Sequence, residues 1–327
     1  MKIIIIGGSG FVGTRLVTRL LKKQHELRIL DKKKSLKYPE LWNYCDVRLP
    51  ETLEKELFGS DVVINLAAEH RDDVTPKTLY DEVNVAGAEN VCNACKKQGV
   101  TRLIFTSSVA VYGFAPPGTD EKGEIHYFND YGRTKWLAEG KYRDWLKEDK
   151  NHSLTIIRPT VIFGEQNRGN VYNLLKQIAS GFFPMIGNGK NVKSMAYVEN
   201  VCAFIEHNLE NSPGEHLFNY IDKPDFDMNT LVSTVYKALG RNKKIIHWPY
   251  VLGMFGGYCF DILAFLTRKK LPISSIRVKK FCSTTMFNAN ALQKTGFVPP
   301  VTLEEGLTRT IQYEFVDKVQ DHVFITE

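Results

Sequence analysis

The feature that most constrains this chain is a glycine-rich turn between an apolar run and a helical pattern. Residues 3–6 are four isoleucines, which is typical of a strand buried on both faces. Gly7, Gly10 and Gly13 follow, and residues 14–23 then have helical periodicity. Such a turn lets a pyrophosphate approach the backbone at the positive N-terminus of a helix. The order predicts a dinucleotide-binding unit; the alternative is a glycine-rich turn that holds no ligand.

Strand and helix patterns alternate through the first half of the chain. We expect further strands at 27–30, just before 45–47, and at 61–66, 103–106 and 153–157, with a long helix over 78–98. This predicts an α/β fold, a Rossmann-type doubly wound parallel sheet with right-handed crossovers and a smaller C-terminal substrate-binding lobe. The expected parts are an NAD-binding domain at 1–165, a region at 166–316 that is mainly the lobe, and a loose polar tail at 317–327.

Side chains at the ends of predicted strands suggest cofactor contacts. A carboxylate at Asp31 can accept from both ribose hydroxyls and would repel a 2′-phosphate, which favours NAD over NADP, although the lysines at 32–34 weaken that argument. Asp46 either accepts from the adenine amino group or is an ordinary loop carboxylate. The small side chains of Ala67 and Ala68 allow a cofactor to pass closely. In the charged loop that follows, Arg71 could meet a substrate phosphate.

Tyr131 and Lys135 are four residues apart in a helical pattern, so they share one face. A free phenol has a pKa of about 10 and is a poor base at neutral pH. A nearby ammonium favours the phenolate, so we expect Lys135 to lower the pKa of Tyr131 and suit it to proton transfer with a hydroxyl. The alternative interpretation is two unrelated surface residues.

Composition excludes several classes of protein. The net charge is +6, from 43 Lys and Arg against 37 Asp and Glu among 327 residues, which is not a nucleic-acid signature. The six cysteines are scattered, and Cys92 and Cys95 lie in a helical pattern without a second pair, so we expect buried thiols and no metal site. Met1-Lys2 leads directly into the first strand without a signal peptide, which predicts a cytoplasmic location.

Three motifs in order resemble the extended short-chain dehydrogenase/reductases, and among them the nucleotide-sugar epimerases. They are the glycine turn, the serines at 107–108 with Tyr112-Gly113, and the Tyr131/Lys135 pair; residues 158–164, 197–200 and 303–307 match as well. Sugar 4,6-dehydratases of this family carry an Asp-Glu pair after the serine, whereas this chain has Val109-Ala110. The resemblance therefore implies an epimerase with NAD as cofactor, and not a dehydratase.

Residues 67–74, 165–172 and 252–261 bring the resemblance closer to bacterial 4-epimerases that act on N-acetylglucosamine linked to undecaprenyl diphosphate. In those enzymes the C4 hydroxyl loses its proton to the tyrosine while hydride passes to NAD, the 4-keto sugar turns over, and hydride returns to the other face. The implied product is the N-acetylgalactosamine lipid that starts O-antigen units.

The resemblance assigns roles residue by residue. Ser108 would hold the 4-hydroxyl, Tyr131 would be the base, and Lys135 its electrostatic partner. The residues implied to line NAD are Gly7, Gly10, Phe11, Val12, Gly13, Asp31, Asp46, Val47, Leu66, Ala67, Ala68, Asn84, Tyr131, Lys135 and Pro159. Those implied to meet the substrate are Ser108, Asn170, Val171 and Lys193. Arg71 and Arg168 are further candidates, because their charges could pair with the substrate diphosphate. At the position of Lys193, soluble epimerases carry an arginine that contacts the nucleotide diphosphate. The lysine is a departure from that pattern and puts ordinary UDP binding in question.

Three other functions stay open: a soluble UDP-N-acetylglucosamine 4-epimerase, an NAD(P)-dependent sugar ketoreductase, and a non-catalytic NAD-sensing protein. We also expect a homodimer through the helices at 76–98 and 131–148, as such folds often form.

Residues 249–267 are strongly apolar, with Asp261 as their only charge and Arg268, Lys269 and Lys270 directly after them. A membrane span needs about 20 apolar residues, and a buried aspartate would cost about 2.5–3.5 kcal/mol, so we expect no span. Three glycines should weaken a helix here. The alternatives are a helix in the lobe core and an interfacial segment, and a polyprenyl substrate favours peripheral contact with the membrane.

Overall fold

The computed structural model describes residues 1–71, 74–181, 183–267 and 274–325. Its centre is a seven-stranded sheet in the order β11-β6-β5-β4-β1-β2-β3, in which all neighbours are parallel. The strands are β1 (Lys2–Ile6), β2 (Glu26–Asp31), β3 (Trp42–Tyr44), β4 (Val62–Asn65), β5 (Arg102–Thr106), β6 (Ser153–Pro159) and β11 (Gly214–Tyr220). The order reverses between β1 and β4, and ligands of such sheets bind at that point, beyond the carboxyl ends of the strands.

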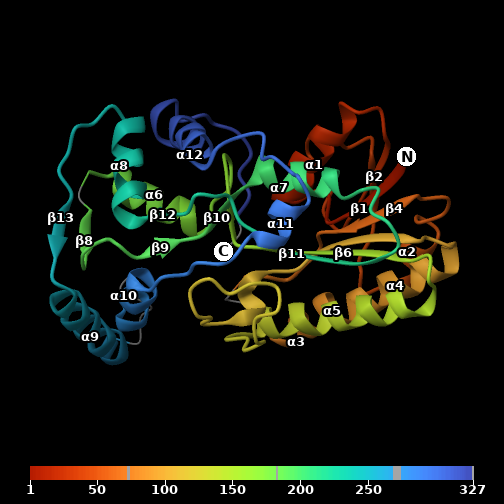
Figure 1. The fold of residues 1–327 in the computed structure, drawn as a ribbon, viewed down its shortest axis with the longest axis horizontal. Coiled ribbons are helices and arrows are strands. Elements are labelled where there is room, and N and C mark those ends of the chain that lie inside the picture. The colour runs from red at the N-terminus through yellow and green to blue at the C-terminus, as the bar shows by residue number, and fades with distance from the viewer. Residues whose placement is uncertain (72–73, 182, 268–273, 326–327) are drawn as a thin grey trace.

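Helices cover both faces of the sheet because its strands are apolar on both faces. Ile3 and Ile5 of β1 belong to one buried cluster, beneath α1 (Phe11–Leu21) and α7 (Val198–His207). Ile4 and Ile6 belong to the other, against α2 (Pro50–Glu54), α4 (Gly87–Gln98) and α5 (Asp130–Glu148). Figure 1 shows these two layers on opposite sides of the sheet. The predicted Rossmann-type fold is confirmed.

The predicted helix over 78–98 is continuous but not regular. It consists of α3 (Thr78–Tyr80), a π-helical segment (Asp81–Ala86) and α4. A π-helical turn adds a residue to the helix and is frequent at functional sites. Here the segment contains Asn84, whose side chain accepts from the Glu69 backbone N–H at 2.8 Å and donates to the Glu69 carbonyl at 2.9 Å. Cys92 and Cys95 are buried in α4, as predicted.

The remaining elements form the lobe and the links between it and the sheet. They are β7 (Val161–Phe163), α6 (Asn170–Ala179), β8 (Pro184–Ile186), β9 (Val192–Lys193), β10 (Met195–Tyr197), β12 (Phe226–Asp227), α8 (Met228–Ala238), β13 (Ile246–Trp248), α9 (Tyr250–Thr267), α10 (Ser275–Cys282), α11 (Asn290–Lys294) and α12 (Leu303–Ile311). The part of the chain that forms the sheet and its helical layers extends beyond residue 165. Helix α7 and strand β11, which come later in the chain, belong to it.

The apolar stretch forms α9, which packs with α10 as a hairpin at one end of the molecule (Figure 1). Only Gly257 of its 18 residues is buried, so the interpretation as a core helix is wrong. The glycines do not interrupt the helix. A Cβ on Gly257 would lie 2.8 Å from the Ser275 Cα, and one on Gly253 would lie 2.4 Å from the Ile186 side chain, so both glycines permit close packing.

Asp261 lies at the start of α10, where it accepts from the Ser275 backbone N–H at 3.2 Å. A carboxylate at a helix N-terminus is stabilised by the helix dipole, which explains the single charge in this apolar helix. By length and composition α9 could cross a membrane, and it is the one such helix among the residues described. Arg268, Lys269 and Lys270 lie outside the described residues.

The C-terminal tail contacts the rest of the chain through Phe324. Phe324 donates its N–H to the Gln166 carbonyl and accepts from the Arg168 N–H, both at 2.8 Å. Its ring packs against that of Phe11, with centroids 5.8 Å apart. The tail therefore returns to the start of α1 and to the loop that leads into α6.

Candidate active site

The glycine turn follows β1 and brings three backbone segments into close contact. Gly7 has φ +78°, and a Cβ there would lie 2.7 Å from the Ala67 N. A Cβ on Gly13 would lie 2.5 Å from the Gly8 Cα. Neither position can carry a side chain without moving backbone, so the turn holds open the N-terminus of α1. The Ser9 hydroxyl in this turn is buried and has no hydrogen-bond partner among the described residues.

The Asp31 side chain, at the carboxyl end of β2, is fixed by two backbone hydrogen bonds. Its carboxylate accepts from the backbone N–H of Ser9 at 3.1 Å and of Lys33 at 2.9 Å. Burial raises the pKa of Asp31, and these two hydrogen bonds oppose the shift. The open helix terminus, the unpartnered Ser9 hydroxyl and this fixed carboxylate fit the pyrophosphate and ribose of NAD.

Substituting Ala for Gly13 is expected to weaken NAD binding by roughly 10- to 100-fold, because overpacking typically costs about 1–3 kcal/mol. NAD titration, followed by calorimetry, measures the effect. Gly140→Ala in α5 is the matched control, since a Cβ there meets nothing within 4 Å. Equal NAD affinities for the two variants would contradict this account of the turn.

The other residues expected at the cofactor occupy the same edge of the sheet. Asp46 follows β3 and pairs with Arg48, whose Nε lies 3.0 Å and Nη2 2.6 Å from its two oxygens; this pairing lowers the pKa of Asp46. Val47 packs against Gly87, where a Cβ would lie 2.7 Å from its side chain. Leu66, Ala67 and Ala68 follow β4, Pro159 ends β6, and Phe11 and Val12 begin α1.

Ser108, Tyr131 and Lys135 meet at the carboxyl end of β5. Ser108 begins a 3₁₀ turn (Val109–Tyr112), and its hydroxyl accepts from the Ala110 N–H at 3.1 Å. Asn129, a helix-capping residue type, accepts from the Gly132 N–H at 2.9 Å and so fixes Tyr131 in the first turn of α5. The Lys135 ammonium lies 5.8 Å from the centre of the Tyr131 ring. The three predicted catalytic residues are therefore neighbours.

The pKa of Tyr131 is shifted in the direction opposite to the prediction. Burial raises it to about 12, and the hydroxyl of Ser108 opposes that rise. Lys135 donates to the Thr106 carbonyl at 2.7 Å instead of to the phenol, and burial lowers its own pKa to about 7. Desolvation therefore exceeds the effect of this ammonium.

A buried ion pair that sequence reasoning missed lies beneath these residues. The Glu139 carboxylate accepts from Arg158 at 2.6 and 2.8 Å and from the Ser107 hydroxyl at 2.6 Å. Arg158 also donates to the hydroxyl of Tyr112 at 2.5 Å. Glu139 is eight residues after Tyr131 on α5, and Ser107 precedes Ser108, so the pair joins the two segments that carry the candidate catalytic groups. Glu139 lies among apolar residues on the buried face of the predicted helix, and this position could have indicated a buried ion pair.

The residues expected to meet the substrate are only partly available for a diphosphate. Arg168 pairs with Glu314 at 2.9 Å and lies over the Tyr172 ring at 4.2 Å. Lys193 donates to the carbonyls of Lys280 at 2.9 Å and Ser283 at 2.6 Å, and burial lowers its pKa to about 8. Asn170 and Val171 begin α6, with Val171 buried. Arg71 is exposed, and its carbonyl accepts from the Tyr80 hydroxyl.

The tail links the cofactor turn to the loop before α6. Besides the Phe324 contacts, the Gln166 side chain donates to Asp321 of the tail at 2.7 Å, and its backbone N–H donates at 2.8 Å to Glu314, which precedes the tail. The tail therefore packs on Phe11 of the cofactor turn and also holds the loop that leads to Asn170. No sequence pattern in the tail indicated these contacts.

Phe324→Ala is expected to weaken NAD binding by roughly three- to tenfold, because an aromatic pair is worth about 0.5–1.5 kcal/mol beyond its buried area. NAD titration of the purified variant measures the change. Ile325→Ala removes an exposed side chain at the next position and is the matched control. If both variants bind NAD like the wild type, the tail does not support the cofactor turn.

Comparison with known proteins agrees with this site. Residues 3–219 match the model of the NAD dependent epimerase/dehydratase family. An Escherichia coli O157:H7 protein named N-acetyl-alpha-D-glucosaminyl-diphospho-ditrans,octacis-undecaprenol 4-epimerase is 53% identical, with 99% of each chain covered. The Vibrio cholerae UDP-glucose 4-epimerase is 27% identical, with 95% of this chain and 94% of the relative covered.

Among solved structures, the UDP-glucose 4-epimerase of Thermus thermophilus in complex with NAD has a TM-score of 0.73 and 21% identity, covering 96% of this chain and 98% of its own. At that identity the likeness shows the fold alone. The family match spans the sheet, the glycine turn and the Ser108–Tyr131–Lys135 group, and the residues at the turn fit NAD. The chain belongs to the NAD-dependent epimerase/dehydratase family.

Proposed function

We propose that this chain is an NAD-dependent 4-epimerase that interconverts N-acetylglucosamine and N-acetylgalactosamine on undecaprenyl diphosphate, for O-antigen or other surface polysaccharide synthesis. The observation that carries the proposal is the 53% identity over 99% of both chains to a relative named for that reaction. The site supports it, because Ser108, Tyr131 and Lys135 are neighbours and no carboxylate occupies positions 109 and 110, where a dehydratase would need one.

In this proposal the chain moves one proton and orients one sugar. Bound NAD supplies a hydride acceptor and donor and a positively charged nicotinamide ring. Ser108 holds the C4 oxygen, and Tyr131 takes the proton of the C4 hydroxyl and later returns it to the same oxygen. Lys135, fixed on the Thr106 carbonyl, anchors the cofactor ribose beside the phenol. The 4-keto sugar turns over between the two transfers, so no net oxidation occurs.

A substrate with deuterium on C4 tests this chemistry. If hydride leaves C4 and returns to C4, the epimerised product retains the deuterium, and no NADH accumulates beyond one equivalent per site. Mass spectrometry of the separated epimers gives the result. Loss of the label to solvent would show that the hydrogen leaves as a proton, and would contradict the proposed reaction.

We propose that the protein acts at the inner face of the cell membrane, in peripheral contact through α9, and pairs as a homodimer through α4 and α5. Exposed apolar residues support the membrane contact, since Val251, Phe255 and Phe265 are 75%, 68% and 84% exposed. Trp248 and Tyr250 are exposed beside them, and the α10 residues Arg277, Lys279 and Lys280 are basic. Aromatic and aliphatic side chains next to cations suit an anionic lipid surface.

The double substitution Phe255→Glu and Phe265→Glu is expected to lower recovery with floated vesicles that contain phosphatidylglycerol by at least about tenfold, since one buried aromatic is worth about 1.5–3 kcal/mol. Phe58→Glu, at a phenylalanine that is 71% exposed on the sheet domain, is the matched control. Flotation of the double variant at the wild-type level would contradict membrane contact through α9.

A further inference from the structure

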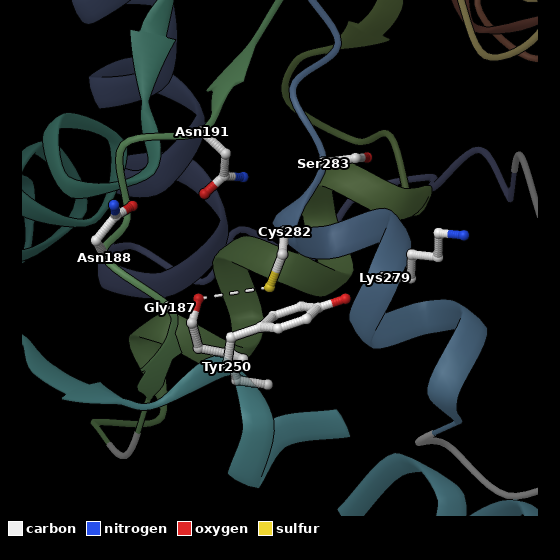
Figure 2. Close-up of a pocket in the computed structure, with 8 residues that line it drawn as sticks. Gly187, Asn188, Asn191, Tyr250, Lys279, Cys282 and Ser283 are labelled. Carbon is white, nitrogen blue, oxygen red and sulfur yellow. Dashed lines mark hydrogen bonds between the residues drawn. The ribbon is translucent and has the colours of Figure 1, made fainter. Parts of the chain in front are cut away.

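A pocket of about 400 Å³ lies where the α9–α10 hairpin joins the lobe (Figure 2). Its lining residues are Ile186, Gly187, Asn188, Asn191, Tyr250, Lys279, Cys282 and Ser283. They come from three places, namely the end of β8 with its following loop, the first residue of α9, and the last turn of α10 with the residue after it. A volume in this range suits a small ligand or part of a larger one.

The pocket has an apolar side and a polar side. Figure 2 shows the ring of Tyr250 below Cys282, and the amides of Asn188 and Asn191 on the opposite loop. Ile186 also lines the pocket. Hydrogen bonds fix both sides. The Cys282 thiol donates to the Ile186 carbonyl at 3.5 Å, and the Asn191 amide donates to the Phe281 carbonyl at 2.8 Å. The pocket can therefore receive a ligand that is polar at one end and apolar at the other.

The α10 wall is connected to the catalytic region. Lys193, the cation expected near the substrate diphosphate, donates to the carbonyl of Ser283, which lines the pocket. The segment after α10 continues to the loop between Ser108 and Tyr131, where the Gly118 N–H donates to the Met286 carbonyl at 2.7 Å. The Lys280 ammonium also lies 4.8 Å from the ring centre of Phe128, three residues before Tyr131.

On its other side the pocket leads to the exposed apolar surface. Tyr250, which lines the pocket, is followed directly by Val251 and Leu252, which are 75% and 58% exposed. From Lys193 through Ser283 and Tyr250 to α9, the side chains change from cationic to polar to apolar. A polyprenyl diphosphate has the same order of chemistry, an anionic head followed by a hydrocarbon chain.

We propose that this pocket binds the first isoprene units of the lipid carrier, next to its diphosphate, and passes the chain onto α9. This inference rests on the proposed function and deepens it, because it makes the carrier itself a recognised part of the substrate and not only a means of membrane attachment. A bare sugar diphosphate would leave the apolar side of the pocket empty.

Soluble substrate analogues without membranes test the pocket. N-acetylglucosamine diphosphate carrying a farnesyl group is compared with the same sugar diphosphate carrying a methyl group, and KM and kcat are measured for both. The wild type is expected to show a KM at least about tenfold lower for the farnesyl compound, at similar kcat. Cys282→Trp, which fills the apolar side, is expected to remove that difference.

Cys259→Trp is the matched control, because Cys259 is an exposed cysteine of α9 outside the lining set. It should keep the farnesyl preference. Equal KM values for the two analogues in the wild type, or a preference that survives Cys282→Trp, would overturn the pocket assignment while leaving the epimerase proposal intact. If the enzyme converts UDP-N-acetylglucosamine but neither of the two analogues, the proposed function itself is wrong.

A second measurement does not depend on the folding of that variant. In the wild-type protein, farnesyl diphosphate is expected to slow maleimide labelling of Cys282 by at least about tenfold and to leave Cys259 labelling unchanged, as followed by peptide mass mapping. Labelling of Cys282 at an unchanged rate under saturating farnesyl diphosphate would overturn the assignment.

Discussion

Replacing Tyr131 by Phe is expected to lower kcat for epimerisation by about 10²- to 10⁴-fold, the range typical of a lost general acid or base. The phenol is the group beside Ser108 that can take and return the proton of the sugar hydroxyl, and phenylalanine keeps the ring but removes the oxygen. NAD binding is expected to stay close to the wild-type value, because Lys135 keeps its hydrogen bond to the Thr106 carbonyl.

The measurement is the initial rate of epimer formation by the purified variant with NAD present, together with its NAD affinity. Tyr127→Phe is the matched control, since that tyrosine lies four residues earlier, in the segment before α5, and is 46% exposed. A Tyr131→Phe enzyme that works within about threefold of the wild type would exclude Tyr131 as the base. It would then favour a protein in which NAD serves sensing instead of chemistry.

Glu139→Gln is expected to be the most destabilising conservative change near the site, costing about 3–5 kcal/mol in the free energy of unfolding. The carboxylate is fully buried and is surrounded by Arg158, Arg143 and the Ser107 hydroxyl. Removing its charge leaves the guanidinium of Arg158 buried at 1% side-chain exposure without a counter-ion. That charge cannot reach water without moving α5 or β6.

Denaturant unfolding of the two proteins measures the loss. Glu148→Gln, on an exposed side chain of the same helix that pairs with Lys96, is the control and should change stability by less than about 1 kcal/mol. Equal stability of the two variants would show that Arg158 finds another partner. The combined Glu139→Leu and Arg158→Met replacement should recover much of the loss, because apolar residues can replace a buried pair.

Most of the sheet could be predicted from local pattern. Four isoleucines, a glycine turn and a helical period determine one β–α unit, and the repeat of that unit determines a doubly wound sheet. The Tyr131/Lys135 spacing likewise placed two candidate catalytic side chains on one helix face, since four residues make about one turn. These features depend on neighbours in the sequence, and therefore local reasoning reached them.

Features that depend on distant segments could not be predicted in this way. The π-helical turn at Asn84 forms where that side chain meets Glu69, and the tail packs against the start of α1 because Phe324 meets Phe11. The direction of the Tyr131 pKa shift was wrong for the same reason. Spacing placed Lys135 beside the phenol, but only the fold shows that its ammonium is directed to Thr106 and that burial dominates.

The apolar stretch at 249–267 shows that composition does not determine where in a fold a helix lies. Composition alone could not distinguish a core helix from a surface helix, because both are apolar. The packing shows that α9 is a surface helix. Gly253 and Gly257 lie against Ile186 and Ser275, and most of its large side chains are exposed. Two of the three glycines that were expected to weaken the helix, Gly253 and Gly257, are the points at which it packs against its neighbours.

The most direct test of the central claim offers the purified protein, with NAD, two substrates in separate reactions. One is undecaprenyl-diphosphate-linked N-acetylglucosamine in detergent or vesicles, and the other is UDP-N-acetylglucosamine; the C4 epimers are separated by chromatography. We predict that only the lipid-linked sugar is converted to the N-acetylgalactosamine epimer. Conversion of only the nucleotide sugar would contradict the account and leave the exposed face of α9 without a role in substrate delivery.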